Sequence, residues 1–180
     1  LLRSGLFIAA FLTFAGIAHA TDYTVTTLDD TEGDGTCDVT ECTLREAIDA
    51  ASTDGTGPNQ VLFDATLSGG TINLDGTFAS IDVEATTAEF TVFANNDITI
   101  NSFGGNPVIF GITNPLASIT IDGINFTNGV VVVSADVASV TIQNCEFSKD
   151  NQNLLTRENT LNAGGHVIIQ DNTFNNTNNA

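Results

Sequence analysis

Hydrophobic and polar residues alternate along much of the chain beyond residue 60, and a period of two is the pattern of β-strands. The alternating runs are short, rich in β-branched and aromatic residues, and separated by residues that favour turns. We expect strands at 71–74, 81–83, 90–93, 108–112 and 130–133. The chain is therefore predicted to be all-β, apart from one segment near its N-terminal end.

A short motif recurs in the second half of the chain. The triplet 98–100, Ile-Thr-Ile, returns as 119–121 and, as Val-Thr-Ile, as 140–142, each time after 21 residues. The triplet 167–169 continues the series after 27 residues, with 151–165 as the expected insertion. Repeats of this length are typical of solenoids, in which each unit buries its apolar face by stacking on its neighbours.

The residues that follow the later triplets are also equivalent. Each triplet leads to a turn residue that tolerates a left-handed backbone, namely Gly123, Asn144 and Asp171. Each turn leads to an aromatic residue that we expect to stack on the next, namely Phe126, Phe147 and Phe174. The threonines of the triplets, Thr99, Thr120 and Thr141, would form a ladder on the outer face. These features favour a parallel β-helix; an antiparallel sandwich, the alternative, does not require the period.

One segment has the pattern of a helix. Thr43 and Glu46 match a capping box, in which each side chain bonds to the backbone N–H of the other residue. The apolar residues that follow lie on one helical face, and the glycines and proline of 55–58 end the segment. We predict a short helix from Thr43 to about Ser52 that covers the open end of the solenoid.

The first twenty residues are predicted to be a signal peptide. Arg3 precedes a short apolar stretch, 6–17, and Ala18-His19-Ala20 has the small-x-small pattern of a cleavage site. A core helix or a membrane anchor is the alternative. No second long apolar stretch follows, so no membrane span is expected once the signal is removed.

The predicted organisation has three parts. Residues 1–20 are the signal peptide, 21–60 an N-terminal cap with a disulfide loop and helix, and 61–180 the β-helix coils. The polar stretch 175–180 contains no capping helix, which leads us to expect a truncated C-terminus.

The charge excludes one class of partner. The formal net charge is −18, from 22 acidic residues and 4 Lys or Arg. A surface this negative repels phosphate backbones and anionic lipids, so nucleic-acid binding is not expected. Solubility in saline surroundings and collection of divalent cations remain two explanations of the acidity.

The three cysteines divide into a pair and a single residue. Cys37 and Cys42 are close together in a chain expected to be exported, which favours a local disulfide; a metal pair is the alternative. Cys145 stands where the preceding repeat has Ile124, which favours a buried, unreactive thiol over pairing with another chain.

An acidic, glycine-containing loop is a candidate calcium site. Hard cations need several oxygen ligands brought together by a tight turn, although the spacing is not that of an EF-hand. The candidate ligands are Asp29, Asp30, Glu32, Asp34 and Asp38. A solvated acidic loop without an ion is the alternative.

The stretch around the predicted helix also resembles a known family. Residues 33–37 and Cys42-Thr43-Leu44-Arg45-Glu46-Ala47 are similar to the N-terminal CSLREA region of bacterial secreted proteins, with Thr43 in place of serine. The resemblance extends from about residue 21 to 75, and the later repeats resemble right-handed, pectin-lyase-like β-helices. It implies right-handed coils and an extracellular or cell-surface location in bacteria.

Catalysis has weak candidates only. The resemblance implies a Lys or Arg base for a polysaccharide lyase, and the repeat region offers Lys149 and Arg157, with Asp150 beside them. A glycosidase would use paired carboxylates, and no pair stands out among the acids available. These acids are Asp122, Asp136, Glu146, Asp150 and Asp171.

The sequence thus predicts a secreted or cell-surface β-helix protein, non-catalytic, in adhesion or glycan binding. A polysaccharide or a cell-surface glycan is the expected partner, and Ca²⁺ the one cofactor for which candidate ligands exist. Two alternatives stay open, a fragment of a carbohydrate-active enzyme (lyase or glycoside hydrolase) and a purely structural stalk.

Overall fold

The structure is a computed structural model of the chain. It describes residues 20–31, 34–54, 57–74, 81–83, 89–102, 108–112, 118–133, 139–149, 155–157 and 166–176. The predicted signal peptide, except for Ala20, lies outside these residues, as do Glu32, Asp136 and Asp150.

Parallel β-strands dominate the described residues. The helical elements are α1 (Leu44–Thr53) and a 3-10 turn, η1 (Ala65–Leu67). The strands are β1 (Asp22–Val25), β2 (Asn59–Phe63), β3 (Thr71–Leu74), β4 (Ile81–Val83), β5 (Glu89–Ser102), β6 (Val108–Ile112), β7 (Ser118–Thr127), β8 (Val130–Val133), β9 (Ser139–Gln143), β10 (Glu146–Lys149), β11 (Leu155–Arg157), β12 (His166–Gln170) and β13 (Thr173–Asn176). The predictions of a mostly β protein and of one helix are confirmed. The strands β1 and β11 were not predicted, and β11 lies within 151–165, the segment expected to be an insertion.

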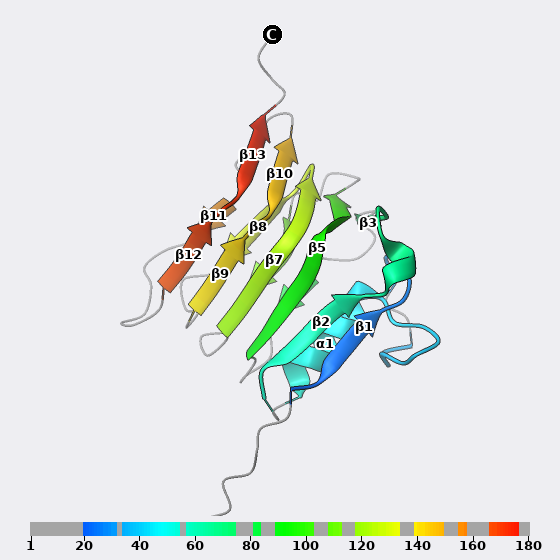
Figure 1. The fold of residues 1–180 in the computed structure, drawn as a ribbon. Helices are drawn as coiled ribbons and strands as arrows, with labels where there is room; N and C mark the ends of the chain where they lie inside the picture. Colours follow the sequence, from blue (N-terminus) through cyan, green and yellow to red (C-terminus); the bar gives the residue numbers. More distant parts are fainter. Residues whose placement is uncertain are drawn as a thin grey trace, which may run out of the picture.

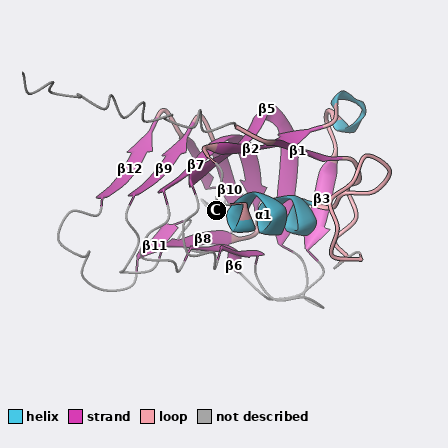
Figure 2. Cartoon of the chain, turned by 90° about the horizontal axis from the view of Figure 1, so that it is seen from below, coloured by secondary structure: helices cyan, strands magenta, loops and turns pink. Residues whose placement is uncertain are grey.

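The strands form two open sheets. The larger, nine-stranded sheet contains β1, β2, β3, β5, β7, β9, β10, β12 and β13, and the smaller contains β4, β6, β8 and β11 (Figure 1). From β3 onward the chain alternates between the larger sheet and the smaller one, and we call each round between the two sheets a passage. Each strand pairs in parallel with a strand from a neighbouring passage. Figure 2 shows the two sheets as separate layers, with α1 between them.

The helix α1 contacts both layers, β1, β2 and β5 of the larger sheet and β4 of the smaller. Its apolar face, with Leu44, Ala47, Ile48 and Ala51, is buried in the same core as the strands. The predicted capping box is present: Thr43 Oγ1 accepts from Glu46 N at 3.2 Å, and Glu46 Oε2 accepts from Thr43 N at 2.9 Å.

Buried side chains stack in columns across the larger sheet. One column runs through residues paired between successive strands, the buried Val61, Val92, Ile121 and Ile142, and ends at Ile169, which is exposed. A second contains the predicted aromatic stack. The rings of Phe126 and Phe147 stack with centroids 5.0 Å apart, and those of Phe147 and Phe174 at 5.2 Å. The stack is confirmed, and its last member, Phe174, is half exposed.

Left-handed residues separate the two strand segments of each passage. Gly123, Asn144 and Asp171 have φ of 70°, 53° and 54°, as their residue types predicted. Asn95 in β5, with φ 50°, is a further turn of this kind. Each turn redirects the chain within the larger sheet, so that residues on both sides of it still face the core.

The predicted alignment of the first triplet is wrong. Residues 98–100 pair with 124–126, whereas 119–121 pair with 90–92. The register of β5 shifts between Phe93 and Ile98, and both triplets have the same alternation, so the pattern alone could not distinguish them. The threonine column is consequently Thr91, Thr120 and Thr141, without Thr99.

Candidate functional site

A pocket lies where the pairing of β2 with β5 is interrupted. Residues 59–61 pair with 90–92, and pairing resumes further along, where β3 joins β5 at Thr71 and Thr99. Between these points a longer segment, 62–70, lies opposite a shorter one, 93–98. Because their lengths differ, the two segments cannot stay in register. They move apart, and a space of about 290 Å³ remains between them.

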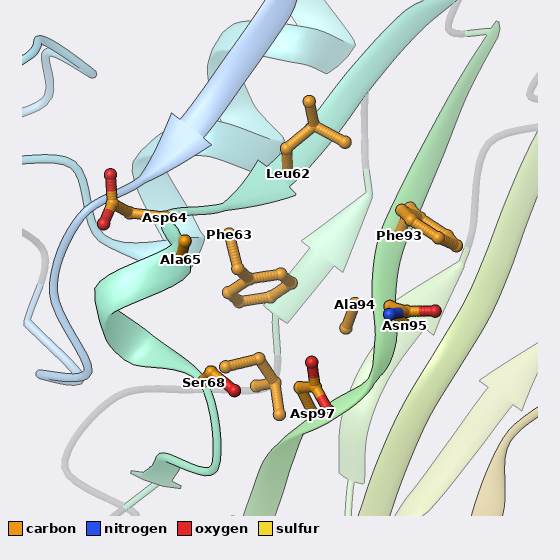
Figure 3. Close-up of a pocket in the computed structure, with 10 residues that line it drawn as sticks. Leu62, Phe63, Asp64, Ala65, Ser68, Phe93, Ala94, Asn95 and Asp97 are labelled. Atoms are coloured by element: carbon orange, nitrogen blue, oxygen red, sulfur yellow. The ribbon is translucent and has the colours of Figure 1, made fainter.

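Ten residues line this pocket, and they combine apolar and polar side chains. They are Leu62, Phe63, Asp64, Ala65, Ser68, Phe93, Ala94, Asn95, Asp97 and Ile98. Figure 3 shows Phe63 on the β2 side and Ala94, Asn95 and Asp97 along β5, with the Asp97 side chain turned toward Phe63. Phe93 is 39% exposed, so an aromatic ring remains available to a ligand.

The turn on one wall of the pocket is held by backbone bonds. Gly69, at φ 76°, donates its N–H to Asp97 O at 2.8 Å, and Gly70 N donates to Leu67 O at 2.8 Å. A Cβ at Gly70 would lie 2.7 Å from Leu67 O, so the close turn requires a residue without a side chain. These contacts hold Ser68 at the rim.

Asp64 is a fixed anion at the opposite end of η1. Its Oδ1 accepts from Thr66 Oγ1 at 2.6 Å and from Thr66 N at 2.9 Å. The hydrogen bond from the Thr66 hydroxyl, followed by the smaller effect of the bond from Thr66 N–H, lowers the pKa of Asp64 below its ordinary value. Asp64 is therefore ionised at neutral pH, and none of the lining residues is Lys, Arg or His.

A second polar opening lies over the turns of the later passages. Asn125, Asn144, Glu146 and Asp171 are among its lining residues. Of the acids weighed for glycosidase chemistry, this opening brings together Glu146 and Asp171.

Amide side chains from the next passage already bind the neighbouring carboxylates. Asp122 accepts from Gln143 Nε2 and Asn144 Nδ2, each at 2.8 Å, and Glu146 Oε1 accepts from Asn175 Nδ2 at 2.8 Å. These bonds join one passage to the next and are sufficient to explain the residue types, so we do not take this opening as the leading site.

The candidate lyase cations lie on different sheets. Lys149 ends β10 of the larger sheet, where it pairs with Asn176, and Arg157 ends β11 of the smaller sheet, where it pairs with Val133. Their side chains, and all of Asp150, lie outside the described residues.

The CTLREA stretch has a structural role in every described contact. Cys42 forms the predicted disulfide with Cys37, which is confirmed. Arg45 Nε donates to Asp30 Oδ1 at 2.6 Å, and its Nη2 donates to Asp30 Oδ2 at 3.3 Å. Glu46 Oε1 accepts from Gly35 N at 3.1 Å. The motif therefore ties the preceding loop to the helix.

The acids proposed as calcium ligands have local partners. Asp30 pairs with Arg45, and Asp29 accepts from Thr27 Oγ1 at 3.0 Å. Asp34 Oδ1 accepts from Thr36 N, and Asp38 Oδ1 accepts from both the hydroxyl and the N–H of Thr40. Among the described residues no three His, Cys, Asp or Glu side chains could hold a metal ion together. Because Glu32 is not among them, calcium binding here stays a prediction.

Cys145 is the buried thiol that the repeat predicted. It is 2% exposed, is not in a disulfide, and its Sγ lies 3.1 Å from Gln143 O. Burial raises the pKa of the thiol to about 11. It is therefore protonated and unreactive at neutral pH, since the thiolate is the nucleophilic form.

No helix within the described ranges is long and apolar enough to cross a membrane. Comparison of the chain with known proteins found no matching family model, no matching curated protein and no matching solved structure.

The pocket between β2 and β5 was not predicted from the sequence. One signal was present: Asn95-Asn96-Asp97 places turn-forming residues inside an otherwise strand-like run, which is typical of a bulge. The sequence could not show that Phe63 and Ser68 lie opposite this bulge, because their position depends on the register of distant segments.

Proposed function

We propose that this chain is an exported or cell-surface bacterial protein, folded as a right-handed parallel β-helix, that binds carbohydrate without cleaving it. The repeated passage between the two sheets and the parallel pairing of successive passages support the solenoid. The resemblance to CSLREA-type and pectin-lyase-like proteins supports the handedness. The signal-like segment 1–20 supports export, and the Cys37–Cys42 disulfide fits an oxidising compartment.

The pocket between β2 and β5 carries the proposal. A sugar ring has an apolar face of C–H groups and a rim of hydroxyls, so its binding sites combine aromatic surface with carboxylates or amides. Phe63 and Phe93 are aromatic residues of the lining, and Asp97 and Asn95 add a carboxylate and an amide. In Figure 3 Asp97 is turned toward Phe63, and Phe93 and Asn95 extend from β5 away from Phe63. Such sites bury mostly apolar surface and orient the ligand with a few polar groups.

A carbohydrate-active enzyme fragment and a structural stalk are the competing functions. The enzyme hypothesis needs a base or paired carboxylates in a groove, and the two candidate cations belong to strands of different sheets. The stalk hypothesis needs no ligand at all. Adhesion through a glycan agrees with both the pocket and the extracellular location that the signal-like segment indicates.

The test is a glycan-array screen of the purified protein, with release of unsaturated or reducing-end products assayed on every glycan bound. Phe93→Ala should weaken binding by about three- to tenfold, the loss expected for one aromatic contact. Phe174→Ala is the matched control, because Phe174 is another exposed phenylalanine, 52% accessible, outside the pocket. Equal losses in the two variants would place the site elsewhere. Product release would support the enzyme, and absence of any binding would support the stalk.

A further inference from the structure

We propose that the pocket between β2 and β5 selects neutral sugars and rejects uronic acids; this inference rests on the proposed carbohydrate-binding function. It concerns the charge of the ligand. Its lining combines apolar residues with two aspartates, an asparagine and a serine, and this composition favours a ligand with hydroxyl donors and no negative charge.

The lining of the pocket contains acidic residues and no basic ones. Asp64 and Asp97 are the ionisable residues among the ten that line the pocket, and both carry negative charge when ionised. The bonds from Thr66 keep Asp64 in its charged form. A uronate carboxylate in this space would therefore meet the Asp97 carboxylate, while the carboxylate of Asp64 adds negative charge nearby but is directed away from Phe63 (Figure 3). No Lys, Arg or His of the lining would offset these charges.

Arg45 is the one Lys or Arg whose side chain is described, and it already binds a carboxylate. Arg45 makes two bonds with the Asp30 carboxylate, through Nε and Nη2. The chain as a whole has a formal net charge of −18, so the long-range field also opposes an anionic ligand.

The polar groups of the lining match the hydrogen-bonding groups of a neutral sugar. Carboxylates only accept hydrogen bonds, so they need donors from the ligand, and sugar hydroxyls supply them. Asn95 adds an amide that both donates and accepts, and Ser68 adds a hydroxyl at the rim. The apolar part of the wall, which includes Phe63 and Ile98, fits the C–H face of a pyranose.

The experiment measures binding of cellohexaose, xylohexaose and mannohexaose against hexagalacturonate by calorimetry, with and without added Ca²⁺. At least one neutral hexamer should bind about tenfold or more tightly than hexagalacturonate without calcium, because like charges repel in a partly desolvated site. Raising the salt concentration should weaken this discrimination, since salt screens the repulsion.

Asp97→Asn separates a charge effect from a general loss of the site. The variant should bind the neutral hexamer several-fold more weakly, because a charged acceptor is lost, while binding of hexagalacturonate should increase. Asp49→Asn is the matched control, since Asp49 is an exposed aspartate on α1, and it should change neither affinity. Circular dichroism and melting temperature should show that both variants are folded.

The outcomes distinguish the two proposals. Tighter binding of hexagalacturonate than of every neutral hexamer, or hexagalacturonate binding that calcium makes dominant, would overturn the inference and leave carbohydrate binding intact. No binding of any hexamer, together with an empty glycan array, would overturn the proposed function itself.

Discussion

Replacing Glu46 tests whether the CTLREA stretch stabilises the fold through hydrogen bonds to the backbone. Glu46 is 5% exposed, and its two oxygens accept from Thr43 N at 2.9 Å and from Gly35 N at 3.1 Å. Thr43 is fully buried, so Glu46→Ala leaves a buried donor unsatisfied at a cost of about 1–3 kcal/mol. Gly35 is exposed and water can replace its partner, so this second loss should cost about 0.5–1 kcal/mol.

The expected decrease in the free energy of unfolding for Glu46→Ala is therefore about 1.5–4 kcal/mol, measured by urea denaturation with circular dichroism. Glu46→Gln retains one acceptor and should lose about half as much. Asp49→Ala, an exposed acid on the same helix, should change stability by less than about 0.5 kcal/mol. The reasoning is refuted if Glu46→Ala costs no more than Asp49→Ala, because the capping box would then contribute nothing.

Three further predictions concern the aromatic stack and the cysteines. Phe147→Ala removes a ring that is 1% exposed and stacked on both faces, so urea denaturation should show a decrease of about 3–5 kcal/mol in the free energy of unfolding. Phe174→Ala, at the half-exposed end of the stack, should lower it by about 1–2 kcal/mol, and equal decreases would contradict the stack. Because burial raises the pKa of Cys145 from 9.0 to about 11, the stability that the neutral thiol contributes should be complete below pH 9 and be lost as the pH rises toward 11. Cys145→Ala should flatten this part of the pH–stability curve, and identical curves for the two proteins would contradict this contribution. Replacing Cys37 and Cys42 together by serine should lower stability by about 2 kcal/mol, the value for a small loop, and an unchanged melting temperature would show that the bond is not stabilising.

The cap could be predicted from the sequence because its interactions are local. Thr43 and Glu46 are three residues apart, so the capping box follows from the order of residues and helix geometry alone. The bond from Gly35 to Glu46 and the ion pair of Asp30 with Arg45 could not, since they depend on how the loop folds back. Sequence reasoning accordingly treated the loop acids as calcium candidates and did not foresee that Asp30 binds an arginine.

Register was predictable only where an additional marker accompanied the alternation. The column of Phe126, Phe147 and Phe174 was correct because each ring follows a turn residue by the same distance. The triplet 98–100 was misplaced because alternation repeats every two residues and fits several registers equally well. The residues that shift this triplet, 94–97, show their effect only when β5 pairs with its neighbours.

The sequence by itself determined most of the strand segments, the helix with its cap, the disulfide and the buried thiol, because each depends on neighbours within a few residues or on a clear repeat. It did not determine β1 or β11. The tertiary structure decided the register of β5 and the pocket in which Phe63 and Asp97 lie on opposite sides. That pocket exists because two segments of unequal length lie opposite one another between stretches of regular pairing. The separation depends on the lengths of both segments, so it cannot be predicted from either segment alone.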